Sequence, residues 1–533
     1  MKGLLIACSV GLGLASGSAF AADLPPVTAA PDVGASAPLP PAAVAVAPTP
    51  PVYSWTGCFI NAGGGYGMWK QDHYGEELSP STPLTPTVSA GGERLVGTVG
   101  AGCDYQAGSR WLIGAFGDYS LTSNVYGGYF EESYWGWTGK ETEQGAWALG
   151  GRIGYLLTPK LLTYVSVGYT RAHLDQVDLL TDADPRVAPA ACGGGPCFIP
   201  AYSDGGWFIG SGTEYALWDL IPIPGLFWRI DYRYARYSSA DVPILTSTGA
   251  PLAATCTGVG AVACDEHFQK NLQTVTSGLV WRFNVDGPAI ASAFADDRRV
   301  TAAPGVWASA PPAPAYRWTG CYINAGVGYG MLEQDHYTNY TSPLFTGSTG
   351  GEGWLGTVGA GCDYQVGSRW VFGAFGNYDF MNLSGSFKDP LTGYIGTQTG
   401  SQAWAAGIRI GYLITPDLLT YIIGGFPQAR FDQINLLPPT PSSPPIPYYY
   451  PAHTYVYGFF WGAGTEYALG DIVPVNGLFW RTEYRYADYN SADLLLMEAG
   501  QSPSVCAHCP LYVNKDVQTV TSGFVWRFNF GGP

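Results

Sequence analysis

The sequence predicts an all-β protein made of two tandem eight-stranded, up-and-down antiparallel transmembrane β-barrels. Three observations predict it: side chains alternate along short segments, the chain contains an internal duplication, and the spacing between the two copies changes unevenly. The composition agrees, because only 12% of the 533 residues are charged while 14% are aromatic, whereas soluble domains carry about 25% charged residues. After the N-terminal segment no run of about 18 apolar residues occurs, so a helical span is not expected.

The N-terminus has the pattern of a cleaved signal peptide. Lys2 precedes an apolar run over 4–14, and small residues lead to Ala21. We therefore expect residues 1–22 to form the signal peptide and the mature chain to begin at Ala22 or Asp23. The formal net charge of −16 repels phosphate backbones, so nucleic-acid binding is not expected.

The duplication sets the domain boundaries. The segment Trp55–Gly63 recurs at Trp318–Gly326, and Val280–Asn284 recurs at Val525–Asn529. We predict one barrel over 53–286 and a second over 316–533. A Pro/Ala-rich leader over 23–52 and a linker over 287–315 precede them, and this composition favours extended chain.

The offset between matching residues falls in steps. It is 263 for Cys58 and Cys321 (321 minus 58) and 245 for Arg282 and Arg527 (527 minus 282). The steps lie in alternate connections, which indicates short turns on one side of a membrane and long loops on the other. Each copy then has eight strands. A single sixteen-stranded barrel is the alternative, but the 29-residue linker (315 minus 287, plus 1) favours two closures.

Alternation assigns the two faces of each strand. Over 226–234 aromatic and aliphatic side chains alternate with Arg229, Asp231 and Arg233. A soluble sandwich also alternates, but its solvated face would recruit Lys freely, and this face holds few. We therefore predict that the charged face lines a narrow, filled lumen, since buried charges persist when paired. The predicted lumen network comprises Asp104, Asp118, Arg152, Glu214, Arg229, Asp231, Arg233 and Arg282 in copy 1, and Asp363, Arg409, Glu466, Arg481, Glu483, Arg485 and Arg527 in copy 2, where Asn377 replaces Asp118.

The cysteines favour disulfides. Of eleven cysteines, Cys8 leaves with the signal peptide, and ten remain on an oxidising route. Matching parity and a shared membrane edge predict the bridges Cys58–Cys103 and Cys321–Cys362. Local bridges are expected for the loop pairs Cys192/Cys197, Cys256/Cys264 and Cys506/Cys509. Zinc at Cys506, His508 and Cys509 is a less favoured alternative, because zinc usually takes four ligands.

The histidines do not indicate catalysis. His73 and His336 lie in a recurring Gln-Asp-His-Tyr segment at the outer end of the first strand of each copy. Hydrogen-bonded rim histidines are the favoured interpretation, over haem or metal contacts. The two copies share no Ser/His/Asp constellation. We therefore expect no catalytic, cofactor-binding or metal site, and no enzymatic activity.

Three motifs resemble a known family: Trp55-Thr56-Gly57 at the first strand, Ala22-Asp23-Leu24-Pro25 at the mature start, and the closing segment Val525–Phe530. They are similar to the OmpA-like outer-membrane surface antigens of alphaproteobacteria, often called porin family. The resemblance covers nearly all of both copies and implies no catalytic residues. Family members usually end on an aromatic residue read by the outer-membrane assembly machinery, whereas here Phe530 precedes Gly531–Pro533 and the first copy ends on Val285.

Together these observations predict a structural, surface-exposed protein of the bacterial outer membrane, with at most small-solute passage through filled lumens. The alternative function is a diffusion porin formed by one sixteen-stranded barrel. The expected partners are outer-membrane lipid and lipopolysaccharide, the outer-membrane assembly machinery during insertion, and an unidentified surface ligand of the long loops.

Overall fold

The computed structural model describes residues 55–283 and 317–528, apart from 79–80, 132–136, 182–188, 219, 222, 253–263, 339–344, 390–392, 439–447, 456–457, 471–472, 474 and 499–510. The expected signal peptide, leader and linker lie outside the described residues. A search of the described residues for helices finds none with the length and apolar character that a membrane span needs.

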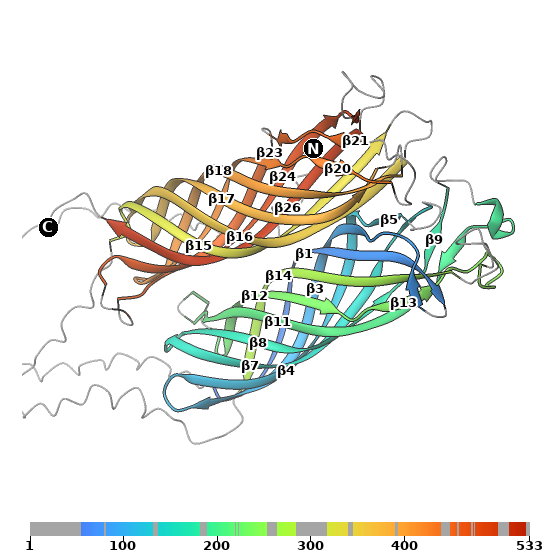
Figure 1. The fold of residues 1–533 in the computed structure, drawn as a ribbon. Coiled ribbons are helices and arrows are strands. Elements are labelled where there is room, and N and C mark those ends of the chain that lie inside the picture. The colour runs from blue at the N-terminus through green and yellow to red at the C-terminus, as the bar shows by residue number, and fades with distance from the viewer. Residues whose placement is uncertain are drawn as a thin grey trace, which may run out of the picture. The chain divides into compact units, whose positions relative to one another are not determined.

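Eight antiparallel strands form the first closed barrel, here called barrel 1 (Figure 1). Its first strand pairs with its last, so that Cys58 lies opposite Phe283. The strands are β1 (Gly57–Leu78), β3 (Val88–Ala107), β4 (Trp111–Gly127), β7 (Glu143–Thr158), β8 (Leu161–Leu174), β11 (Tyr202–Ala216), β12 (Leu226–Tyr237) and β14 (Cys264–Phe283).

Eight further strands form barrel 2, a second ring that also closes on itself. Here Cys321 lies opposite Phe528. The strands are β15 (Gly320–Thr338), β16 (Phe345–Val366), β17 (Trp370–Lys388), β18 (Ile395–Thr415), β19 (Leu418–Phe431), β23 (Gly458–Ala468), β24 (Leu478–Leu494) and β26 (Leu511–Phe528). Since β14 pairs with β1 and β15 pairs with β26, two separate closures are confirmed and the sixteen-stranded alternative is wrong.

Tight turns join the strands at one end of each barrel, the turn end. Gly108 and Gly367 occupy matching turns with φ of 70° and 63°. A Cβ at either position would contact nothing, so the left-handed backbone explains the glycine rather than crowding. The opposite end, the loop end, carries the long connections, as the uneven spacing predicts.

The long connections contain short strands of their own. In barrel 1 these are β2 (Ser81–Pro83), β5 (Tyr129–Glu131), β6 (Thr138–Lys140), β9 (Val177–Leu179), β10 (Cys197–Ile199) and β13 (Ala240–Pro243), with the 3-10 turn η2 (Ala190–Cys192). In barrel 2 they are β20 (Ile434–Leu436), β21 (Tyr448–Tyr450), β22 (His453–Tyr455) and β25 (Met497–Glu498). Buried apolar clusters that include residues of these strands contain Leu179 and Ile199 in barrel 1 and Leu436 and Tyr450 in barrel 2. We call each such assembly a cap.

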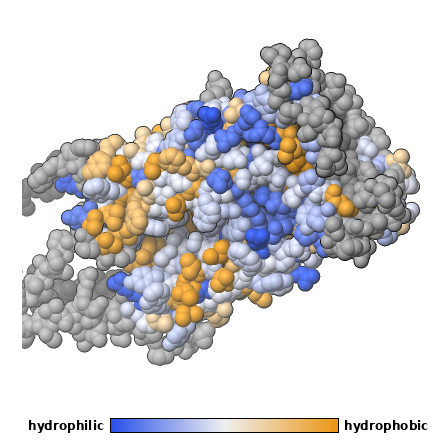
Figure 2. Space-filling model, viewed as in Figure 1, coloured by the Kyte–Doolittle hydropathy of each residue, from blue (hydrophilic) through white to orange (hydrophobic). Residues whose placement is uncertain are grey.

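The two faces of the strands differ as alternation requires. On β7, Arg152 is 3% exposed and its neighbour Ile153 is 53% exposed. Outward hydrophobic residues continue on β4 from Trp111 to Leu121, 11 residues (121 minus 111, plus 1), which matches the roughly 9–11 residues of a membrane-crossing strand. Figure 2 shows hydrophobic residues gathered over the turn end, at the left of the view, and hydrophilic residues farther toward the loop end.

Candidate functional site

Three arginines meet two carboxylates inside barrel 1 near its turn end. Arg152 donates to both oxygens of Asp104, at 2.9 and 2.5 Å, and to Glu214 at 2.6 Å. Arg229 donates to Glu214 at 2.6 Å, and Arg282 donates to Glu214 at 2.6 Å and to Asp104 at 2.7 Å. All five side chains are buried. We call this group the arginine cluster of barrel 1.

The residues around this cluster pack closely against it. Phe59 presents its ring to all three guanidinium groups, with centroid distances of 4.5 to 5.1 Å, a contact that favours a desolvated cation. A Cβ at Gly114 would lie 1.9 Å from Asp104 Oδ1, so this glycine makes room for the carboxylate. The cluster is therefore packed as well as paired.

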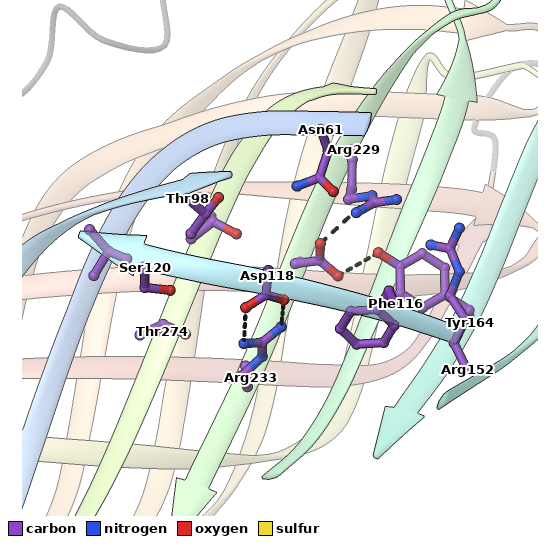
Figure 3. Close-up of a pocket in the computed structure, with 13 residues that line it drawn as sticks. Asn61, Thr98, Phe116, Asp118, Ser120, Arg152, Tyr164, Arg229, Arg233 and Thr274 are labelled. Atoms are coloured by element: carbon purple, nitrogen blue, oxygen red, sulfur yellow. Dashed lines mark hydrogen bonds and ion pairs between the residues drawn. The ribbon is translucent and has the colours of Figure 1, made fainter. Parts of the chain in front are cut away.

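A second layer of pairs lies next to the cluster, toward the loop end. Arg233 donates to both oxygens of Asp118, at 2.9 and 2.5 Å, and the Tyr164 hydroxyl donates to Asp231. Figure 3 shows the pair of Arg233 and Asp118, and both pairs line a cavity of about 40 Å³. Since a water molecule needs about 10–15 Å³ of such space, the lumen has room for a few waters here and is not an open bore.

Barrel 2 repeats the arginine cluster. Arg409 donates to Asp363 at 2.7 Å and to Glu466 at 3.1 Å. Arg481 donates to Glu466 at 2.9 Å, and Arg527 donates to Glu466 at 2.6 Å and lies 2.7 Å from Asp363. Tyr322 replaces Phe59 beside the guanidinium groups, at 4.7 to 5.0 Å. The predicted lumen residues are thus brought together in both copies.

Asp379 is a member of this network that the sequence reasoning missed. Arg485 contacts Glu483 at 2.8 Å and Asp379 at 3.4 Å. Asn377 is the counterpart of Asp118 at the matching position of the second copy. The carboxylate of barrel 2 lies two residues farther along β17, at Asp379. Because residues two apart share a face, parity could have found it. Asp379 brings barrel 2 to four acids and four arginines, the balance that barrel 1 has.

A further buried group near the loop end of barrel 1 was also missed. Arg94 forms an ion pair with Glu143, and Lys270 pairs with Glu141 at 2.6 Å and with Glu143 at 3.7 Å. Lys270 also lies 4.3 Å from the centroid of the Trp69 ring. We call this region the outer chamber. In the sequence, this group was indicated only by strand alternation, which places Arg94 and Lys270 on the inward face. Alternation assigns no face to Glu141, because it precedes β7.

The structure joins Cys58 to Cys103 and Cys321 to Cys362 by disulfides, directly across neighbouring strands. Cys192 and Cys197 are joined within the cap of barrel 1. The remaining predicted pairs involve Cys256, Cys506 and Cys509, which lie outside the described residues together with His508, while Cys264 begins β14.

The recurring histidines are buried at the loop end. His73 shares a hydrogen bond of 2.9 Å with the Glu131 carbonyl, and His336 packs edge-on against Phe387 at 5.3 Å. The described residues bring together a different group with metal-ligating atoms, Glu76, Asp241 and His267 at the loop end of barrel 1, whose donor atoms lie within 4.8 Å of one another.

Closed antiparallel barrels with lipid-facing apolar belts and polar lumens are outer-membrane β-barrels, and the chain is an outer-membrane β-barrel protein. Residues 300–528 match the family model described as outer membrane protein beta-barrel domain. No curated protein sequence matches the chain significantly.

Solved structures similar to the chain include the outer membrane protein OprG from Pseudomonas aeruginosa, with 12% identity, coverage of 43% of this chain and 97% of that chain, and a TM-score of 0.28. The Pseudomonas putida toluene transporter TodX shows 12% identity, coverage of 89% and 90%, and a TM-score of 0.25. These scores are too low to support an inference about function.

Proposed function

We propose that the chain is a non-enzymatic, surface-exposed envelope protein whose two barrels hold folded caps at the cell surface, with at most small-solute passage through each lumen. The observation that carries the proposal is the arginine cluster, in which Arg152, Arg229 and Arg282 occupy the lumen around Glu214. Removing such buried charges from their partners is costly, so the cluster would not part to admit a large solute.

The resemblance to OmpA-like surface antigens supports the same role. It also extends the proposal to cleavage of residues 1–22 and to insertion by the outer-membrane assembly machinery. The apolar belt would contact outer-membrane lipid, and the loop-end surface would face lipopolysaccharide. The caps, rather than the lumens, would meet an unidentified surface ligand.

Planar-bilayer conductance of the purified protein tests the proposal. We expect no steady nanosiemens pores from the wild type, because a lumen of this width is filled by side chains. Arg233→Ala should raise the conductance by widening the cavity beside Asp118. The matched control is Arg236→Ala, which removes an exposed arginine from the same strand. If the wild type shows steady nanosiemens pores, this proposal is wrong and the protein is a solute channel.

A further inference from the structure

Three carboxylates lie in a row on the outer face of barrel 2. Glu333 of β15 is directly opposite Asp516 of β26, and Asp516 is directly opposite Asp488 of β24. Glu333 shares its face with Val327, which is 66% exposed, because side chains an even number of residues apart point to the same side of a strand. Like charges directly opposite each other destabilise a sheet. The row is therefore unfavourable unless another charge compensates it.

Barrel 1 brings a further carboxylate to this row. Both barrels belong to one compact unit, residues 52–533. Glu93 of β3 accepts a hydrogen bond of 3.0 Å from the Tyr486 hydroxyl of β24. One carboxylate oxygen from each of Glu93, Glu333 and Asp516 lies within 4.8 Å of the other two. We call these three residues the acidic triad.

The acidic triad is buried without a positive partner. Glu93 and Glu333 are 3% and 2% exposed. Glu333 Oε1 has no hydrogen-bond partner among the described residues, and the charged groups that act on Glu333 are the carboxylates of Asp335, Glu93 and Asp516. Within the part of the chain that the structure describes, no lysine or arginine forms an ion pair with the triad. Buried charges in proteins are usually paired or coordinate a metal.

The spacing of the three oxygens suits a hard divalent cation. Ca²⁺ binds oxygen atoms at about 2.3–2.6 Å, so two oxygens on opposite sides of it lie about 4.6–5.2 Å apart. The limit of 4.8 Å within the triad therefore allows one ion to contact all three carboxylates. Bidentate contacts and water would complete the shell of about six to eight oxygens. The triad offers no nitrogen or sulfur ligand, which disfavours zinc and copper.

The triad lies on the loop-end side of the apolar belt. Glu333 follows Tyr329 by four residues (333 minus 329) toward the loop end, and Tyr329 packs edge-on against Trp354 at 5.3 Å. Trp354 is 70% exposed, and Trp and Tyr gather where a membrane meets water. Asp516 is partly exposed. An ion can therefore reach the triad from the aqueous side.

We propose that the acidic triad binds one divalent cation, of the size of calcium, and that this ion joins barrel 1 to barrel 2. Its two positive charges offset two of the three carboxylate charges. Because Glu93 belongs to barrel 1, while Glu333 and Asp516 belong to barrel 2, neither barrel holds the complete site. The sequence of one copy alone therefore gives no sign of it. This inference goes beyond the proposed envelope role and does not depend on it.

Binding can be measured on the intact folded protein in detergent, after metal has been removed with EDTA. Terbium(III) occupies oxygen sites of this kind, and a nearby tyrosine such as Tyr486 sensitises its luminescence. We expect saturable sensitised luminescence that calcium displaces and that sodium at equal ionic strength does not. The unfolding midpoint should be higher in calcium chloride than in sodium chloride at equal ionic strength, since a ligand of the folded state stabilises it.

Three variants make the test specific. Glu93→Gln and Glu333→Gln each remove one charged ligand, the first from barrel 1 and the second from barrel 2. Each should weaken terbium and calcium binding by roughly tenfold or more, because ligand charge sets the affinity of such sites. The matched control is Glu352→Gln, which neutralises a carboxylate that already accepts a hydrogen bond of 2.6 Å from Asn271. It should leave the affinity unchanged.

The outcomes that contradict the proposal are equally specific. If protons rather than a metal neutralise the triad, the wild type shows no luminescence that calcium displaces, and the proposal is wrong. Unchanged affinity in Glu333→Gln would exclude the triad as the binding site. Unchanged affinity in Glu93→Gln would exclude the ion as a link between the barrels. The same calcium effect on the unfolding midpoint in all four proteins would also overturn the proposal.

Discussion

Glu214 accepts hydrogen bonds from Arg152, Arg229 and Arg282, so each arginine of the cluster is held by a carboxylate that it shares. Removing one partner of a buried pair costs about 3–5 kcal/mol, because the remaining charge stays buried. Of the three arginines, Arg229 lies directly opposite Glu214 on the neighbouring strand, β12 against β11. The cluster is thus a residue-level source of barrel stability.

We predict that Arg229→Ala lowers the unfolding free energy of barrel 1 by about 3–5 kcal/mol, and that Arg481→Ala does the same in barrel 2. Urea unfolding followed by the heat-modifiable gel shift measures the change. Arg236→Ala, at an exposed position of the same strand as Arg229, should shift the midpoint little. An unchanged gel shift in Arg229→Ala would contradict the inward assignment.

The relocated acid of barrel 2 gives a second prediction. Barrel 1 has Asp118 and Ser120 where barrel 2 has Asn377 and Asp379. Asp379→Ser should destabilise barrel 2 by about 1–3 kcal/mol, since Arg485 loses a partner. Adding Asn377→Asp should recover most of that loss by recreating the barrel 1 pair. The four proteins form a double-mutant cycle, and simple additivity would argue against a shared arginine partner.

The side of the barrel wall that a residue faces could be predicted wherever strand alternation applies. A period of two placed Arg229, Arg481 and their partners in the lumen without any structural information. Asp379 was missed because the copies were compared position by position, while a lumen charge can move two residues and still face the same arginine. The outer chamber of barrel 1 was missed because its acid Glu141 lies outside any strand, where alternation assigns no face.

At the level of elements, two disulfides, Cys58–Cys103 and Cys321–Cys362, each join the first two strands of a barrel at the turn end. Cys58 and Cys103 are 45 residues apart, and closing such a loop restricts the unfolded chain by roughly 4 kcal/mol. We predict that Cys58→Ser/Cys103→Ser lowers barrel 1 stability by up to that amount, with Cys192→Ser/Cys197→Ser, which opens a five-residue separation, as the milder comparison. Peptide mapping that recovers Cys58 and Cys103 as free thiols in oxidised protein would refute the pairing.

The barrel strands were predictable and the caps were not. Alternating segments and turn residues such as Gly108 mark the strands locally. The cap strands are only two to four residues long, too short for a period to be visible. Some of them also pair with strands from a different loop, as β21 does with β25. Packing of apolar loop residues over the lumen, rather than local sequence, determines them.

At the scale of the whole molecule, the described strands form two barrels, and each barrel closes with its own strands. Every barrel strand of residues 57–283 finds both of its neighbours within that range, so no barrel strand of the first copy depends on the second for its backbone ladder hydrogen bonds. The partners of its arginine cluster, Asp104 and Glu214, also belong to the same copy. Two features of the sequence indicate this arrangement: the long linker, and the fact that each copy has its own first and last strands.

We therefore predict that residues 53–286 expressed alone refold in detergent to a heat-modifiable species, and that residues 316–533 do so independently. Both fragments should resist protease at the strands, because each ring leaves no open edge. The comparison is a fragment over 53–237, which lacks β14 and should stay unfolded because β1 and β12 then lose their shared partner. If 53–286 fails to fold while the full chain succeeds, the first barrel needs the second for stability even though its strands close alone. If the fragment over 53–237 folds equally well, closure by β14 is not what stabilises the barrel.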